Sequence, residues 1–123
     1  MHNTIFVVDD NDTNLAMAKE VLKEHYRVMT LPSAAKMFAL LEKVCPDLIL
    51  LDIEMPEMNG FEALEQLKST TGLADIPVIF LTSDADAPTE DKGFQKGVVD
   101  FILKPFTAPG LLDRIKTHLG ADE

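Results

Sequence analysis

The stretch LILLDIEMPEMNG, residues 48–60, carries an unbroken apolar run directly into an acid. Leu48 to Leu51 are apolar on both faces of an extended chain, which is typical of a strand in a parallel sheet covered by helices on both sides. Asp52 ends the run, and the proline and the Asn-Gly pair that soon follow are turn signals. The stretch therefore predicts a buried strand whose final carboxylate emerges at the edge of a sheet.

Apolar runs and helical stretches alternate along the rest of the chain. The runs typical of strands lie at about residues 4–9, 27–31, 47–51, 76–82 and 99–104. After each run comes a stretch that is expected to be helical, at about 11–26, 33–44, 61–70, 87–96 and 108–119. Asp12, Ser33 and Thr107 are the predicted N-caps of the first, second and fifth helices.

This order predicts one α/β domain spanning residues 1–123. Strands that alternate with helices through right-handed crossovers give a doubly wound (βα)5 sandwich of the flavodoxin-like type. Its parallel five-stranded sheet is expected to have the order 2-1-3-4-5. The length of 123 residues suits a single core, and a hydrophobic content of 46% excludes a disordered chain.

The composition indicates which classes of partner the protein can bind and in which compartment of the cell it is expected. The formal net charge of −10 argues against direct nucleic acid binding, because phosphate backbones select basic surfaces. No apolar run approaches the roughly 20 residues needed to span a bilayer, and residues 1–3 lack the basic start of a signal peptide. We therefore expect a cytoplasmic protein that does not bind membranes.

The sulfur-containing residues are expected to be structural. The lone cysteine, Cys45, cannot form an internal disulfide, and we expect it to be a small buried residue. Met17, Met29 and Met37 are expected to fill the core.

Polar side chains stand at the ends of four predicted strands. They are Asp9 and Asp10 after the first, Asp52 after the third, Thr82 and Ser83 after the fourth, and Lys104 after the fifth. In a doubly wound sheet, ligands bind beyond the carboxyl ends of the strands, where the winding reverses. With the order 2-1-3-4-5, that point lies between the first and third strands. We therefore expect three carboxylates, a hydroxyl and an ammonium group to meet in one crevice.

Three carboxylates in one crevice need a counter-charge. Two carboxylates ~4 Å apart repel each other by about 4 kcal/mol at an effective dielectric constant of about 20. Oxygen ligands in a partly open site suit Mg²⁺, which keeps several of its waters. A carboxylate beside such an ion can act as a nucleophile toward a phosphoryl group and form an acyl phosphate. Lys104 and Thr82 are placed to contact the phosphoryl oxygens, and the small Ser83 leaves room for the group.

Four motifs together resemble the receiver domain of two-component response regulators, of the chemotaxis-type fold. They are VVDD (7–10), LILLDIEMPEMNG (48–60), FLTSD (80–84) and DFILKPF (100–106). Each motif lies at the end of a predicted strand, and their order is that of the family. The resemblance covers essentially the whole chain, and the four motifs together are specific although each alone is weak.

The resemblance implies roles for the strand-end residues. Asp52 is the expected phosphorylation site. Asp9, Asp10, Asp52 and the backbone carbonyl of Glu54 are the expected ligands of Mg²⁺, with Mn²⁺ as an alternative ion. Asp10 is expected to be the direct ligand of the acidic pair. Lys104 is expected to pair with Asp52 first and with the phosphoryl oxygens afterwards.

The resemblance also implies a conformational switch. Thr82 is expected to move to the phosphoryl group, with Ser83 as a further phosphate-binding residue, and Phe101 is expected to turn inward behind Thr82. The Lys104–Pro105 peptide bond is expected to be cis. The predicted helix at 87–96 offers little to bury besides Ala87 and Phe94, so we expect it to be mobile and to respond to the switch.

The implied function is a phosphorylation-dependent signalling switch, which is not an enzyme acting on an external substrate. A sensor histidine kinase or a phosphotransfer protein is the expected donor of the phosphoryl group. The surface of the fourth helix, fifth strand and fifth helix is expected to change and to control a partner or an output domain. Homodimerisation through the same surface is a further expectation.

Two other functional classes share part of this pattern. A Mg²⁺-dependent phosphatase with an aspartyl nucleophile needs Asp-x-Asp-x-Thr/Val. The fifth position counted from Asp10 is Asn14, and the residues after Asp52 break the pattern as well. A flavodoxin-like cofactor binder needs a phosphate-binding loop after the first strand, where Asp9 and Asp10 would repel a phosphate.

Overall fold

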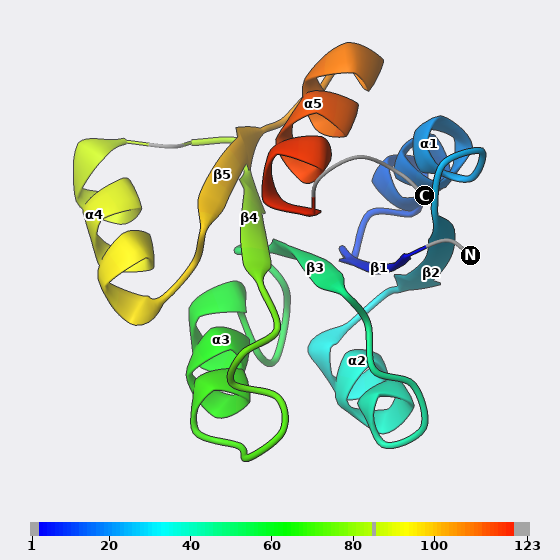
Figure 1. Ribbon diagram of the computed structural model, residues 1–123. Coiled ribbons are helices and arrows are strands. Elements are labelled where there is room, and N and C mark those ends of the chain that lie inside the picture. The colour runs from blue at the N-terminus through cyan, green and yellow to red at the C-terminus, as the bar shows by residue number, and fades with distance from the viewer. Residues whose placement is uncertain (1–2, 85, 120–123) are drawn as a thin grey trace.

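A computed structural model describes residues 3–84 and 86–119 of the chain. Over these residues, parallel strands form one sheet, namely β1 Thr4–Val8, β2 Arg27–Leu31, β3 Leu48–Asp52, β4 Val78–Thr82 and β5 Asp100–Leu103. The helices that follow them are α1 Asp12–Leu22, α2 Ala34–Leu41, α3 Gly60–Lys68, α4 Ala87–Lys96 and α5 Ala108–Leu119. The strand order β2-β1-β3-β4-β5 confirms the predicted doubly wound, flavodoxin-like fold (Figure 1).

The sheet has an apolar layer on each face, which explains why the central strands do not alternate polar with apolar residues. Phe6 and Val8 of β1 face one layer, and Ile5 and Val7 face the other. Helices α2 and α3 cover the first layer, whereas α1 and α5 cover the second (Figure 1). Because both faces are buried, every residue of β3 is buried.

The register of the central strands places their carboxyl ends side by side. Val8, the last residue of β1, pairs with Leu51 of β3. Asp9 follows β1 by one residue, and Asp52 is the last residue of β3. The two acids therefore emerge next to each other at the point where the winding reverses.

The helix caps are predicted correctly at two of three positions. The Ser33 hydroxyl accepts the Lys36 N–H at 3.1 Å, and the Thr107 hydroxyl accepts the Gly110 N–H at 3.1 Å. The prediction for α1 was wrong by one residue, since its cap is Asn11. The Asn11 side-chain oxygen accepts the Asn14 N–H at 3.0 Å. Asp12 instead lies in the first turn, where its negative charge favours the helix N-terminus.

Several side chains lie elsewhere than predicted. Cys45 is exposed, because it lies in the connection between α2 and β3 and not in the packed part of the helix. Met37 is buried as expected and Met29 is partly buried, but Met17 is 42% exposed on α1. The expectation for Met17 came from its residue type, whereas the buried face of α1 is formed by Leu15, Ala18 and Leu22.

Helix α4 also packs differently from the prediction. Ala87 is exposed, and Phe94 is 49% exposed. The buried residue of this helix is Gly93. A glycine therefore lies at the position where α4 meets the core.

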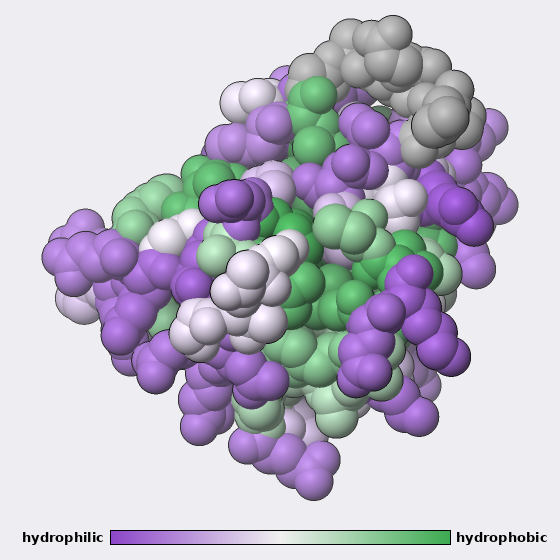
Figure 2. Space-filling view, turned by 60° about the horizontal axis from the view of Figure 1, so that its bottom comes forward, coloured by the Kyte–Doolittle hydropathy of each residue, from purple (hydrophilic) through white to green (hydrophobic). Residues whose placement is uncertain are grey.

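The surface over α2 and α3 is partly apolar. Figure 2 shows this side of the molecule, with apolar residues gathered near its centre and hydrophilic residues around them. Partly buried apolar residues of this half of the core include Phe38, Leu41, Phe61 and Leu73. Among the described residues, no helix combines the length and the apolar character that crossing a bilayer requires.

Candidate functional site

An ammonium group joins two acids at the carboxyl edge of the sheet. The Lys104 Nζ lies 3.0 Å from Oδ1 of Asp52 and 3.2 Å from Oδ2 of Asp9. Asp9 and Asp52 are buried, and the Lys104 side chain is only 16% exposed. The structure therefore brings together these three strand-end residues, which are far apart in the sequence. The Lys104–Pro105 peptide bond is cis, as predicted.

Asp9 is held by two further hydrogen bonds that the sequence did not reveal. The Asn11 backbone N–H donates to Oδ1 at 2.9 Å, and the Asn14 side-chain amide donates to Oδ2 at 3.1 Å. Asn14 lies in the first turn of α1, so the helix turns its amide back toward the end of β1. A polar residue in the first turn after a strand-end acid is the signal that could have indicated this contact.

Asp10 completes a cluster of three carboxylates. Asp9, Asp10 and Asp52 each offer one carboxylate oxygen, and these atoms lie within 4.8 Å of one another. Asp10 is exposed, whereas the other two acids are buried. A set of oxygen donors that is open on one side fits a hard divalent cation such as Mg²⁺. The exposed Glu54 follows β3 by two residues, and the role of its carbonyl stays a prediction.

The electrostatics of the cluster depend on burial. Burial raises the pKa of Asp52 to about 6, and the negative charge of Asp9 contributes to the increase. The hydrogen bond and the charge of Lys104 act in the opposite direction. Burial by itself would lower the pKa of Lys104, but the hydrogen bond and charge of Asp52, together with Asp9, raise it overall. Lys104 is therefore a cation at neutral pH.

Thr82 and Ser83 lie on the opposite side of Asp52 from β1. Thr82 ends β4 and is buried. Its hydroxyl donates to the Asp84 backbone carbonyl at 3.2 Å and accepts the Asp84 N–H at 3.1 Å. Ser83 is exposed. The Thr82 hydroxyl is thus bonded to the backbone of the β4–α4 loop.

Phe101 lies in β5, which pairs with β4, and its side chain is buried. Its ring contacts Phe80 edge to face, with ring centroids 5.7 Å apart, and Phe94 in the same way at 5.3 Å. Phe80 in turn contacts Phe61 of α3 at 5.0 Å. A continuous chain of aromatic rings therefore runs along one face of the sheet, from α3 to α4.

The loop after Asp52 approaches α3 very closely. A Cβ added to Gly60 would lie 2.6 Å from the backbone oxygen of Asp52 and 2.7 Å from the Cα of Ile53. Asn59 caps α3 in a capping box, in which its side chain accepts the Glu62 N–H and Glu62 accepts the Asn59 N–H. The sequence indicated a turn at this Asn-Gly pair, but it did not show that Gly60 supports the backbone of Asp52.

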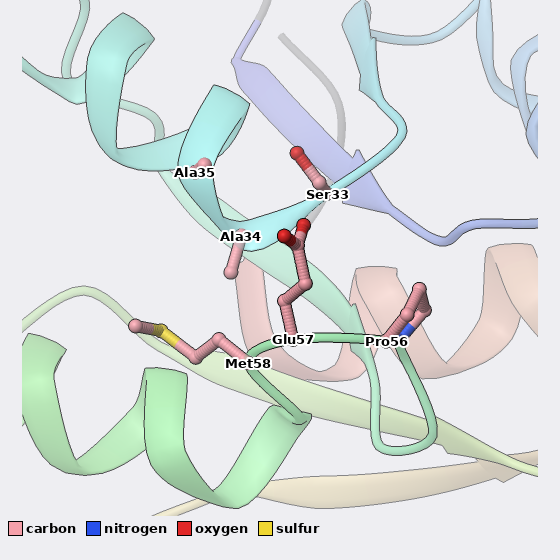
Figure 3. A pocket seen from close by; sticks show the side chains of 6 residues that line it. All are labelled: Ser33, Ala34, Ala35, Pro56, Glu57 and Met58. Atoms are coloured by element: carbon pink, nitrogen blue, oxygen red, sulfur yellow. The ribbon is translucent and has the colours of Figure 1, made fainter.

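A cavity of about 260 Å³ lies beside this loop and next to α2. It is lined by Ser33, Ala34, Ala35, Pro56, Glu57 and Met58. Figure 3 shows the Glu57 side chain reaching toward Ser33 at the start of α2. Glu57 has a positive φ of 70°, which is uncommon for a residue with a side chain. None of the strand-end acids lines this cavity, so it is separate from the acidic cluster.

Comparisons with known proteins agree on one family. The family model named response regulator receiver domain matches residues 5–116. The polar-differentiation response regulator DivK of Brucella ovis is 32% identical over 121 residues, which are 98% of each chain. A probable cyclic di-GMP phosphodiesterase of Vibrio cholerae is 40% identical over 116 residues, which are 94% of this chain and 26% of that protein.

A solved structure supports the fold independently of sequence. The chemotaxis protein CheY4 of Vibrio cholerae matches with a TM-score of 0.91, over 96% of this chain and 99% of that one. The identity is 24%, so this likeness supports the fold alone.

Proposed function

This chain belongs to the response regulator receiver domain family of two-component signalling, and we propose that it is a phosphorylation switch with Asp52 as the acceptor. The observation that carries the proposal is the Lys104 ammonium group bonded to both Asp52 and Asp9 at the edge of the sheet. This arrangement offers a nucleophilic carboxylate and a cation for the phosphoryl oxygens in one place.

The acidic cluster supports a resident divalent ion. The carboxylates of Asp9, Asp10 and Asp52 and the carbonyl of Glu54 would hold Mg²⁺, with Mn²⁺ as an alternative. When bound, the ion would offset the negative charge of an incoming phosphoryl group. The hydrogen bonds from Asn11 and Asn14 would keep Asp9 oriented toward it.

The reaction begins with Asp52 in its ionised form, which predominates at pH 7 because its pKa is about 6. A carboxylate oxygen of Asp52 attacks the phosphorus atom of a phosphohistidine on a sensor histidine kinase or a phosphotransfer protein. The new bond joins that oxygen to phosphorus, and the phosphorus–nitrogen bond breaks, leaving the imidazole on the donor. Lys104 then moves its hydrogen bond from Asp52 to a phosphoryl oxygen, and the small Ser83 leaves space for the group.

The switch would follow from the hydroxyl of Thr82. It exchanges its bonds to the Asp84 backbone for a bond to a phosphoryl oxygen, which changes the β4–α4 loop. Phe101 and the α4-β5-α5 surface respond, and this surface controls a partner, a second copy of the chain or an output domain. Residues 1–123 act as one receiver unit, in the cytoplasm.

The phosphodiesterase named above is a protein of which this chain matches 26%, so we propose no phosphodiesterase activity for the chain.

Incubation with Mg²⁺ and beryllofluoride tests the proposal. We expect one adduct per chain at Asp52, no adduct in Asp52→Asn, and changed hydrogen exchange over residues 87–101. A phosphatase would instead turn over an added phosphate ester many times. Unchanged exchange at 87–101 while Asp52 is occupied would rule out the proposed response of α4.

A further inference from the structure

Gly93 faces the edge of the Phe101 ring. It is the buried residue of α4. A Cβ built on Gly93 would overlap Cζ of the Phe101 ring, and it would lie 3.0 Å from Cε1 of that ring and 3.2 Å from a Val98 methyl group. The edge of the ring therefore occupies the space that a side chain at position 93 would need.

The glycine is unfavourable for the helix itself. Glycine in a helix interior is less favourable than alanine by about 1 kcal/mol. Gly93 has no positive φ that would require glycine, unlike Gly97 at the end of the same helix, which has a φ of 110°. The close approach of the Phe101 ring is thus the feature of the structure that accounts for glycine at this position.

A groove on the outer side of β5 offers a second position for the Phe101 ring. A groove of about 350 Å³ lies between α4 and α5, and it is lined by Glu90, Phe94, Asp100, Phe101, Leu103 and Arg114. Phe94 and Leu103 are 49% and 56% exposed and form its apolar walls. Phe101 itself borders this groove, so the groove offers space beside its ring.

We propose that Gly93 is the positioning residue that holds the Phe101 ring in its inner position. Even one methyl group at position 93 displaces the ring into the groove between α4 and α5. Residue 93 therefore sets the balance between the inner and outer positions of the ring. The connection of this balance to signalling rests on the proposed function, whereas the fit between Gly93 and the ring does not.

A double-mutant cycle tests the fit between the two residues. Phe101→Leu removes the Cε and Cζ atoms that meet position 93 and keeps an apolar side chain. In the Phe101→Leu background, Gly93→Ala should raise the folding equilibrium constant, because alanine favours the helix. In the parent chain, the same substitution should lower it. The effect of Gly93→Ala on the folding equilibrium constant should differ between the two backgrounds by at least about fivefold. A coupling of this size is within the range for side chains in contact.

Additive effects of the two substitutions would overturn the proposal. A Gly93→Ala chain that does not fold while the double variant folds supports it, and failure of both to fold contradicts it. Gln95→Ala, at an exposed position of α4, is the control for helix propensity alone and should behave alike in both backgrounds.

The position of the ring is measured by nuclear Overhauser effects. In the parent chain, the Phe101 ring protons should be close to the Gly93 Hα protons. In Gly93→Ala, they should instead be close to the methyl groups of Leu103, and a ring that stays inside would contradict the proposal.

Beryllofluoride binding to the parent chain is measured separately. Loss of that binding alone would overturn the proposed function, and an additive cycle alone would overturn the role of Gly93.

Discussion

The Lys104 ammonium group and the Asp52 carboxylate lie 3.0 Å apart, although 52 positions separate them in the sequence. The same ammonium group lies 3.2 Å from Asp9. One cation thus contacts two buried acids and offsets part of the repulsion between them. The fold places this cation because β5 and β3 both end at the same edge of the sheet.

Replacing Lys104 with methionine should destabilise the metal-free protein. Removing one partner leaves Asp9 and Asp52 without a counter-charge, and we expect a loss of about 2–4 kcal/mol in the free energy of unfolding at pH 7. Urea unfolding followed by circular dichroism measures it. Lys116→Met, at an exposed position of α5, is the matched control and should change the free energy by less than about 0.5 kcal/mol. Equal stability of the two variants would show that Lys104 does not offset the charge of these acids.

The stability of the metal-free protein should depend on the ionisation of Asp52. Its pKa is about 6 in the folded protein, compared with an ordinary value of 3.8. The folded state therefore binds the proton more tightly, so the contribution of Asp52 to stability is present below about pH 4 and is lost as the pH rises to about 6. The Asp52→Asn variant should not lose stability in this way. At pH 7, its free energy of unfolding should exceed that of the parent chain by on the order of 1–3 kcal/mol.

Unfolding midpoints of both chains at pH 4 and pH 7, without divalent ions, check this sign. A stability difference between the two chains that stays constant over this range would contradict the raised pKa. Adding Mg²⁺ at pH 7 should stabilise the parent chain more than Asp52→Asn, because the ionised carboxylate is a ligand of the proposed ion.

Replacing Asn14 with alanine should weaken Mg²⁺ binding. The Asn14 amide donates to Asp9 Oδ2, and groups that orient a metal ligand typically contribute 10- to 100-fold in affinity. We expect the Kd for Mg²⁺ to rise by roughly tenfold, as measured by calorimetric titration. Thr13→Ala, an exposed neighbour, should leave the Kd unchanged. If Asn14→Ala binds Mg²⁺ as tightly as the parent chain, Asn14 has no role in orienting Asp9.

Replacing Gly60 with alanine should disturb the backbone of the acceptor. The added Cβ would lie 2.6 Å from the Asp52 backbone oxygen, and backbone atoms can move little to relieve such an overlap. We expect a loss of about 1–3 kcal/mol in stability and slower beryllofluoride binding. Glu62→Ala breaks the capping box of the same helix without this overlap, so it should lose about 1 kcal/mol and retain beryllofluoride binding. Full beryllofluoride binding by Gly60→Ala would contradict a supporting role for Gly60.

Much of the fold was predictable from the sequence because both faces of the sheet are buried. Runs such as Leu48 to Leu51 have no polar side, and this pattern predicts a parallel sheet that helices cover on both faces. The convergence of Asp9, Asp52 and Lys104 followed from one topological rule about the carboxyl ends of strands. These features depend on the alternation of elements along the chain, which the sequence displays directly.

Other features depend on how elements meet in space, and the sequence does not display them. The close approaches at Gly60 and Gly93 are contacts between two elements that one loop joins. The positive φ of Glu57 occurs at a residue that gives no sign of it. Cys45 was wrongly predicted to be buried because its residue type favours burial, whereas its place in a connection exposes it.

The central claim is that Asp52 accepts a phosphoryl group, and the mass of the intact chain after incubation with acetyl phosphate and Mg²⁺ tests it most directly. We expect the parent chain to gain the mass of one phosphoryl group, which peptide mapping locates at Asp52, and Asp52→Asn to gain none. Equal labelling of both chains, or a label at another residue, would contradict the claim.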